Sequence, residues 1–383
     1  MKIHILGGAT TKFGELWGVS PRDLAREAMS QALLHSSMKP KDIDAIFVGN
    51  MLSGILGNQA NLGSLIAEEL GVFVPAIRVE AACASGGLAL HTAINGIRSG
   101  QYKNVLVVGI EKMTDHSSDD VTTGLMAAGS DDERSAGATF PGLYALIARA
   151  YMQEYGVTEE DLAGVSVKNH YHGSLNVKAQ FQSPITVADV MKSSRIADPL
   201  KLLDCSPISD GAAAVVITGE NPKKWHKKPI AISASEVASD TLSLHKRSSF
   251  TSLSAVVKAA KQAYAVAGIA SKDVDVAEIH DCFSIAEAIG TEDLGFSKKG
   301  MGAKDIAAGK FTLGIGKLVT NPSGGLKACG HPVGATGIKQ IVELSEQLRG
   351  TAGKRQVEKA RIGLAHNVGG SGTLAVIHIL STL

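Results

Sequence analysis

The sequence runs twice through the same succession of segments, and this repeat limits the fold more than any other feature. Each copy has an apolar run, a stretch with helical spacing of apolar residues, and a second apolar run. The first copy covers residues 45–49, 87–98 and 104–110, and the second covers 273–279, 334–350 and 360–365. Short apolar runs that alternate with helical stripes are typical of layered α/β proteins. The repeat therefore predicts an α/β fold built from two related halves that pack face to face.

Residues 114–205 interrupt this repeat with polar stretches, a helical segment and a basic, histidine-bearing segment. Structureless loops of this length are rare in compact domains. We therefore expect an inserted loop domain at 114–205 that lies over the functional site. The N-terminal half then comprises 1–113 and 206–222, and the C-terminal half comprises 223–383.

Charge and cysteine usage exclude several classes of function. The chain has 38 basic and 37 acidic side chains, so its formal charge of +1 favours neither nucleic acid nor an anionic membrane. No run approaches the ~18 consecutive apolar residues of a membrane helix, and the N-terminus lacks a signal-peptide core. The four cysteines lie far apart without a CxxC pair, which predicts free thiols and no structural metal site. We expect a cytoplasmic protein.

Cys83 stands between an extended segment and a helix, within the sequence EAACASGG of residues 80–87. At such a junction a thiol lies near free backbone N–H groups and the positive end of the helix dipole, which favours the thiolate. The small neighbours let the backbone approach a substrate carbonyl, as a nucleophile elbow requires. Taken alone, this segment would instead favour a tightly packed turn with an inert cysteine.

Further chemistry-bearing residues follow in the second half of the chain. His280 and Cys282 come directly after an apolar run, and their spacing directs both side chains to one side of an extended chain. A metal site is an alternative, but two ligands without a second pair are a weak zinc signal. His331 lies in a glycine-rich turn before a helix, where an imidazole can be held beside a backbone anion site. A lone histidine is more often structural, so the hypothesis depends on the whole set.

Four separated motifs, in this order, resemble those of the thiolase superfamily. They are the run 80–88, the tetrad HDCF at 280–283, the glycine-rich stretch 321–337 and the closing HNVGGSG at 366–372. The resemblance covers nearly the whole chain. It is closest to the archaeal acetyl-CoA acetyltransferases and the sterol-carrier-protein type thiolases, which carry HDCF in place of NEAF. It implies the thiolase fold, with two βαβαβαββ halves in five α-β-α-β-α layers and an inserted loop domain.

The resemblance also implies a role for each catalytic side chain. Cys83 is the nucleophile that carries the acyl group, and His331 takes its proton. His280 positions a water or a side chain at the second thioester. Common thiolases have a C-terminal catalytic cysteine at about the position of His366, which cannot act as a thiol base. In the HDCF branch Cys282 takes that role and removes the α-proton.

The remaining site residues act through the backbone or as supports. We expect the oxyanion to be bound by the backbone N–H groups of Cys83, Gly369 and Gly370, and we expect Asn321 and Gly330 to support the site. Cys205 and Cys329 are expected to stay outside the mechanism, although Cys329 is close enough in sequence to His331 to lie near the pocket.

The activity implied is acyl-CoA:acetyl-CoA C-acyl transfer, here the reversible Claisen condensation of two acetyl-CoA to acetoacetyl-CoA and coenzyme A. We expect no metal and no cofactor beyond the coenzyme A thioesters, a homodimer or tetramer, and a role in lipid metabolism through the mevalonate pathway. The resemblance also suggests a complex with 3-hydroxy-3-methylglutaryl-CoA synthase and a small zinc-binding bridging protein. Alternatives are a degradative 3-ketoacyl-CoA thiolase of broader chain length, a β-ketoacyl or 3-hydroxy-3-methylglutaryl synthase, which lacks the second thiol, and a catalytically silent scaffold subunit.

Overall fold

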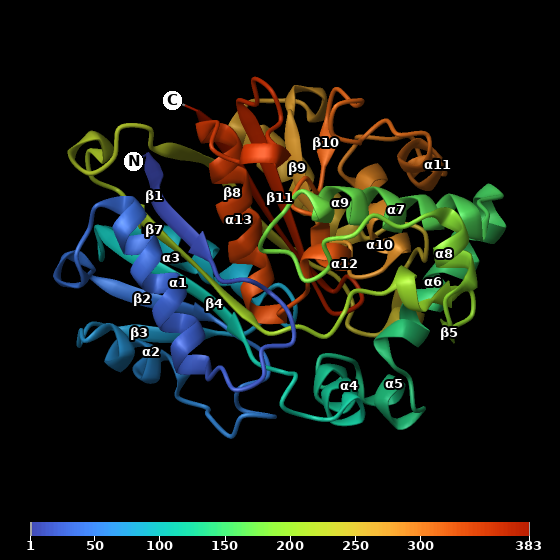
Figure 1. The fold of residues 1–383 in the computed structure, drawn as a ribbon, viewed down its shortest axis with the longest axis horizontal. Coiled ribbons are helices and arrows are strands. Elements are labelled where there is room, and N and C mark those ends of the chain that lie inside the picture. The colour runs from blue at the N-terminus through green and yellow to red at the C-terminus, as the bar shows by residue number, and fades with distance from the viewer. Residues whose placement is uncertain (1, 383) are drawn as a thin grey trace.

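The computed structural model describes residues 2–382, and most of its strands form one mixed sheet (Figure 1). The N-terminal half contributes β1 (Ile3–Thr10), β2 (Ala45–Gly49), β3 (Ala76–Val79), β4 (Asn104–Glu111) and β7 (Gly211–Thr218). The C-terminal half contributes β8 (Ile230–Ser239), β9 (Val276–Ile279), β10 (Val319–Thr320), β11 (Ile362–Gly369) and β12 (Leu374–Thr382). The order across the sheet is β10-β9-β11-β12-β8-β1-β7-β4-β2-β3.

The two halves share their strand order and their strand directions. In each half the second strand pairs in parallel with the third and the fourth. The fifth strand pairs antiparallel with the fourth and with the first. β1 pairs antiparallel with β8 and so joins the halves into a ten-stranded sheet. The predicted α/β fold with two related halves is confirmed.

An aspartate at the same place in each half shows how closely the halves correspond. The Asp44 carboxylate, just before β2, accepts hydrogen bonds from the backbone N–H groups of Lys103 at 2.8 Å and Asn104 at 2.9 Å. Asp275, just before β9, accepts in the same way from Arg361 at 2.8 Å and from the next residue of β11 at 3.0 Å. In both halves the carboxylate fixes the start of the strand that pairs with its own.

Helices form three layers around the two half-sheets (Figure 1). Between the halves lie α3 (Ser85–Arg98) and α13 (Val333–Arg349), which share one apolar core with strands of both halves. α1 (Pro21–Ser36) and α2 (Leu62–Leu70) cover the outer face of the N-terminal half. α9 (Ser254–Ala267) and α10 (Ser284–Asp293) cover the outer face of the C-terminal half. This is the expected five-layered α-β-α-β-α arrangement.

The two central helices meet through glycines. A side-chain carbon added at Gly86 would lie 2.7 Å from the carbonyl oxygen of Gly334, so the helices approach at backbone contact distance. Cys83 precedes α3 and His331 precedes α13. The contact therefore brings both residues to the same end of the central layer.

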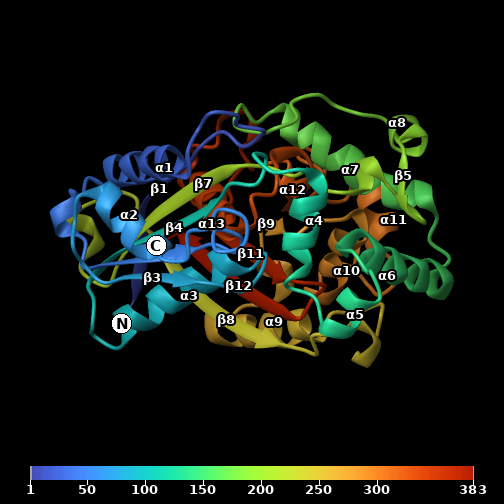
Figure 2. The ribbon, with the colours of Figure 1, turned by 90° about the horizontal axis from the view of Figure 1, so that it is seen from below.

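The segment between β4 and β7 carries five α-helices, a short hairpin and a 3-10 helix at Leu202–Asp204. Its elements are α4 (Ser118–Met126), α5 (Asp131–Ser135), α6 (Phe140–Tyr155), α7 (Glu159–Ser174), α8 (Val187–Lys192), β5 (Arg195–Ala197) and β6 (Leu200–Lys201). α7 contacts α10, α11 (Gly302–Ala307) and α12 (Gly325–Cys329) of the C-terminal half, and Figure 2 shows α6 and α7 on that side. The division of the chain at 114 and 205 stays a prediction. Within residues 2–382, no helix has both the length and the apolar character needed to cross a membrane.

Candidate active site

Cys83 lies in a sharp turn between β3 and α3, as the sequence predicts. The turn requires a positive φ of 51° at Ala82, which is an uncommon conformation for a residue other than glycine. Ser85 holds the turn, because its hydroxyl accepts from the Ala81 N–H at 2.9 Å and donates to the Ala82 carbonyl at 2.6 Å. Glu80 accepts from the Ala82 N–H at 2.6 Å. The half-buried thiol of Cys83 is therefore presented on a rigid elbow.

His331 is fixed so that one ring nitrogen stays free for Cys83. Its Nδ1 lies 2.7 Å from the Thr336 hydroxyl, which itself donates to the Pro332 carbonyl at 3.1 Å. The hydroxyl must therefore accept from Nδ1–H, and this assigns the lone pair of His331 to Nε2. The backbone N–H of His331 donates to the Ser209 hydroxyl at 3.0 Å. Nε2 has no hydrogen-bond partner and is available to accept a proton.

His280 has the opposite tautomer, and Asn367 sets it. The Asn367 Oδ1 accepts from the Gly87 N–H at 3.1 Å, so its Nδ2 is the donor. This Nδ2 donates to the Cys83 carbonyl at 2.9 Å and lies 3.3 Å from the Nδ1 of His280. His280 therefore accepts at Nδ1 and carries its proton on Nε2, which has no partner. One imidazole of the site is a proton acceptor and the other is a hydrogen-bond donor.

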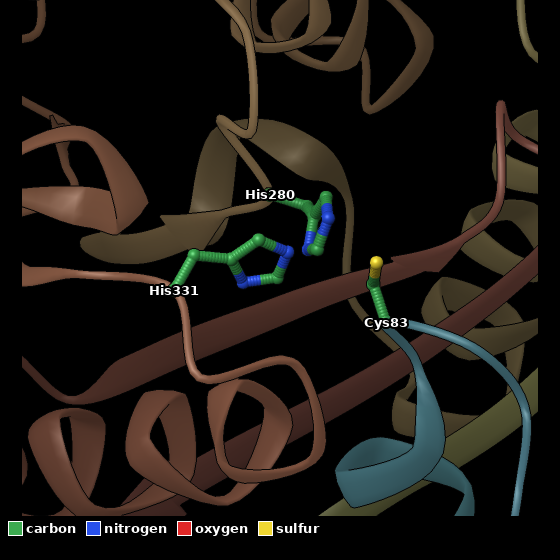
Figure 3. A group of neighbouring side chains, drawn as sticks. All are labelled: Cys83, His280 and His331. Carbon is green, nitrogen blue, oxygen red and sulfur yellow. The ribbon is translucent and has the colours of Figure 1, made fainter. Parts of the chain in front are cut away.

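The two imidazoles and the thiol point toward one another (Figure 3). The ring centroids of His280 and His331 are 5.1 Å apart with nearly perpendicular planes, and one nitrogen of each ring lies within 4.8 Å of the other and of the Cys83 sulfur. This spacing brings the expected nucleophile and both histidines together. The same three donors could also hold a metal ion.

Both expected thiols open on one cavity of about 190 Å³. Cys282 follows β9 and is 6% exposed, and Cys83, His331 and Gly370 border the same space. Most of the other walls are apolar; they include Met113, Leu125, Phe140, Tyr144, Ile208, Phe283 and Val333. Two sulfurs from distant parts of the chain thus face a single pocket that suits a small acyl group.

Burial keeps the resting site uncharged. It raises the pKa of the Cys83 thiol far above its ordinary value, with smaller contributions from the nearby Cys282 and Glu111, and it raises the pKa of Cys282 to about 12. Burial and the charge of Lys339 lower the pKa of His331 to about 3, and burial also lowers the pKa of His280 strongly. The sequence suggested a resting thiolate at Cys83, whereas the structure favours a neutral thiol, because desolvation outweighs the helix dipole.

The turn after β11 packs directly on the nucleophile elbow. A side-chain carbon at Gly369 would lie 2.5 Å from the Ala81 carbonyl oxygen, and Gly370, with φ of 61°, borders the cavity. Arg247 holds this turn through its guanidinium, which donates to the carbonyl of Ser371 and, at 2.9 Å, to its hydroxyl. The expected oxyanion residues Cys83, Gly369 and Gly370 are thus brought together.

Asn321 and Gly330 support the backbone. The Asn321 side chain accepts from the Ile279 N–H at 2.7 Å and so fixes the end of β9, one residue before His280. Gly330 has a φ of 111°, and a side-chain carbon added there would lie 2.9 Å from the Ser209 hydroxyl oxygen, so there is no space for a side chain. Both residues position the histidines.

Asp281 holds the HDCF tetrad in place through buried hydrogen bonds. Its carboxylate accepts from the backbone N–H groups of Leu326 at 2.6 Å and Lys327 at 3.2 Å, and from the Asn169 side chain at 2.6 Å. Burial, with the nearby Glu287, raises the pKa of Asp281 to about 6. The side chain thus ties the tetrad to α12 and to α7.

Cys205, Cys329 and His366 lie at different places relative to the cavity. Cys205, expected to stay outside the mechanism, borders the cavity, because its backbone pairs with that of Phe283. Cys329 is buried in a separate cluster around Phe13. His366 does not border the cavity, and its Nδ1 accepts from the His280 N–H at 3.3 Å. Asn367 and Tyr144, which sequence reasoning gave no role, both reach the site; the only signal for Asn367 was its place in the closing motif.

Comparison with known proteins places these features in a family. The profile described as "Thiolase, N-terminal domain" matches residues 3–221, and that described as "Thiolase C-terminal domain-like" matches residues 236–382. The chain is 48% identical to an acetyl-CoA acetyltransferase of Methanothermobacter thermautotrophicus over 99% of both chains. It is 37% identical to the benzoylsuccinyl-CoA thiolase subunit BbsB of Thauera aromatica, over 96% of this chain and 95% of that one.

Among solved structures, the chain is similar to the Ltp2-ChsH2(DUF35) aldolase, with a TM-score of 0.84 and 26% identity over 100% of this chain and 98% of that one. It also shares its fold with human mitochondrial 3-ketoacyl-CoA thiolase in complex with CoA. That comparison gives a TM-score of 0.75 and 17% identity, over 100% of this chain and 98% of the human chain.

Proposed function

Because this chain belongs to the thiolase family, we propose that it is an acetyl-CoA C-acetyltransferase that condenses two acetyl-CoA to acetoacetyl-CoA and coenzyme A, reversibly. The observation that carries this proposal is the single cavity on which Cys83, Cys282 and His331 open. One thiol is suited to hold an acyl group while the other acts on a second substrate in the same space.

In the first half-reaction the Cys83 sulfur attacks the thioester carbon while its proton passes to the free Nε2 of His331. The Nε2–H of His280 and the backbone N–H groups of the Cys83 elbow are the donors available to the oxyanion, and each such donor contributes about 3–4 kcal/mol in comparable sites. The bond between the acyl carbon and the coenzyme A sulfur then breaks. The departing sulfur takes a proton from Cys282, which becomes a thiolate.

In the second half-reaction the Cys282 thiolate removes a proton from the methyl group of a second acetyl-CoA. The electron pair of that C–H bond forms the enolate, whose carbon attacks the acyl group on Cys83. The Cys83 sulfur leaves and takes back its proton from His331. Protons and charges balance over the cycle, so we propose that no cofactor beyond the coenzyme A thioesters takes part.

The thiolysis of acetoacetyl-CoA tests the proposal. We expect Cys83→Ala to lose both acyl-enzyme formation and turnover. Cys282→Ala should lose turnover in both directions while Cys83 can still be acylated, as mass spectrometry of the intact protein would show. Cys329→Ala is the matched control, because that thiol is buried away from the cavity. Turnover retained in Cys282→Ala would exclude a thiolase, and an inactive wild-type protein would favour a scaffold subunit.

A broader substrate range is the second candidate. The apolar cavity walls and the similarity to a benzoylsuccinyl-CoA thiolase subunit support a degradative 3-ketoacyl-CoA thiolase of longer chain length. Comparing kcat/KM for acetoacetyl-CoA and for 3-ketoacyl-CoA substrates of increasing length distinguishes the two. A role in the mevalonate pathway, a homodimer or tetramer, and a complex with 3-hydroxy-3-methylglutaryl-CoA synthase and a zinc-binding bridging protein stay predictions of the sequence, as does the cytoplasmic location.

A further inference from the structure

Tyr144 brings a hydroxyl from the inserted segment into the catalytic cavity. It lies in the second turn of α6. Its side chain is 2% exposed and is among the largest of the buried side chains. Its ring stacks on Phe283 with centroids 4.6 Å apart, one residue from Cys282. The phenol is therefore held in place by the residue that follows the proposed base.

The hydroxyl of Tyr144 has one weak hydrogen bond within the site. It donates to the Gly370 carbonyl at 3.3 Å, which is long for an O–H···O hydrogen bond. It also borders the cavity on which the Cys282 thiol opens. A weak bond to a neutral carbonyl leaves the O–H group free to turn to a stronger, charged acceptor.

Cys282 needs such a donor. A thiolate in an apolar cavity is stabilised mainly by hydrogen bonds, and burial raises the pKa of the Cys282 thiol to about 12. The Asp281 carboxylate, next in sequence, opposes the thiolate, and the more distant Lys327 favours it. Tyr144 is a neutral donor on the wall of this cavity, and its ring stacks on the residue that follows Cys282.

We propose that Tyr144 is a positioning residue for proton transfer, whose hydroxyl turns from the Gly370 carbonyl to the Cys282 thiolate once coenzyme A has left. The phenol keeps its own proton throughout. The α-proton moves from the substrate methyl group to the Cys282 sulfur, and the electron pair stays on carbon as the enolate. This inference rests on the proposed function, because it assigns a partner to the base of that reaction.

Tyr144→Phe keeps the stacked ring and removes the hydroxyl. We expect acylation of Cys83 by acetyl-CoA to proceed at nearly the wild-type rate. The kcat for condensation should fall about 10- to 100-fold with little change in KM, the range expected for a lost hydrogen bond to a charged group. The kinetic isotope effect with methyl-deuterated acetyl-CoA should rise, because enolate formation becomes the slow step.

Tyr151→Phe is the matched control. Tyr151 lies on the same helix and is as deeply buried, but its hydroxyl bonds Glu292 away from the cavity. If the Tyr144 hydroxyl had only a structural role, Tyr144→Phe would behave like Tyr151→Phe. Each variant would then have a lower melting temperature, and neither would slow condensation more than acylation. Equal losses in the two half-reactions, or an unchanged isotope effect, would overturn the proposal.

Should Tyr144→Phe fail to fold, 3-fluorotyrosine placed at position 144 tests the same point with almost unchanged shape. As a stronger donor it should give an isotope effect no larger than that of the wild type, and a larger one contradicts the proposal. If the proposed function itself is wrong, the wild-type protein will neither acetylate Cys83 nor condense acetyl-CoA. That outcome is distinct from an effect confined to the Tyr144 variants.

Discussion

The Asn367 side chain donates to the carbonyl oxygen of Cys83 at 2.9 Å across 284 residues of sequence. Through this bond the end of β11 and the nucleophile elbow form one unit. Because the same amide nitrogen lies 3.3 Å from the Nδ1 of His280, a single side chain sets both the position of the nucleophile and the tautomer of the neighbouring imidazole. Asn367 is thus the structural link between the two halves of the site.

Removing this amide should affect the first half-reaction. We expect Asn367→Ala to lower the rate of Cys83 acylation about 100-fold, because the Nε2–H of His280 is one oxyanion donor and is no longer fixed. Rapid-quench measurement of acyl-enzyme formation checks this. Asn95→Ala, on the exposed surface of α3, is the control. Acylation at the wild-type rate in Asn367→Ala would show that His280 needs no partner.

The contact between Gly369 and the elbow predicts a steric effect. Gly369→Ala would place a carbon 2.5 Å from the Ala81 carbonyl oxygen, and backbone atoms cannot easily move. We expect about 1–3 kcal/mol loss in the free energy of unfolding and a large loss of kcat, since the oxyanion turn is displaced. Gly363→Ala, in the same strand, would place its carbon against the Leu344 side chain, with the nearest atom, a terminal methyl carbon, at 3.2 Å, and should change both quantities much less. Chemical denaturation and steady-state kinetics measure both.

Arg247 should affect both stability and activity, because it holds the turn at Ser371. Arg247→Met removes its hydrogen bonds to Ser371 and keeps much of the buried volume. Hydrogen bonds from a charged group contribute about 1.5–3 kcal/mol each, so we expect a lower free energy of unfolding and a kcat/KM at least 10-fold lower. Arg361→Met, at an exposed position, is the control. An active, equally stable Arg247→Met protein would contradict a role for this clamp.

The buried histidines predict acid sensitivity. Burial lowers the pKa of His378 to about 3, whereas an unfolded chain protonates histidine near pH 6.5. Between these values the unfolded state binds more protons, so the free energy of unfolding falls as pH decreases from about 6.5 toward about 3. His378→Gln should reduce this slope by about 1.4 kcal/mol per pH unit. Urea denaturation across pH 4 to 7 measures it, and a slope equal to that of the wild type would disprove the assignment.

The control for this experiment is His245→Gln, because His245 is exposed. Its substitution should leave the slope unchanged. His331 and His366, whose pKa values burial also lowers to about 3, should add to the acid sensitivity that remains in His378→Gln.

Much of the architecture could be predicted from local patterns. The apolar runs and helical stripes report which residues of a segment are buried, so they predicted the strands β2, β4, β9 and β11 and both central helices. Their repetition predicted two halves, because equal patterns bury equal faces. The small residues around Cys83 predicted the elbow, since that turn depends only on neighbouring backbone.

The tertiary structure alone decided which distant side chains complete the site. Tyr144 and Cys205 reach the cavity, and Asn367 reaches the Cys83 carbonyl, through packing between elements far apart in sequence, and no periodicity encodes that. The charge of the thiols was decided in the same way. A helix N-terminus can be recognised in a sequence, but the desolvation that keeps Cys83 neutral depends on every element packed around it. Local pattern determines what each segment buries, and only the assembled fold determines what each segment is buried against.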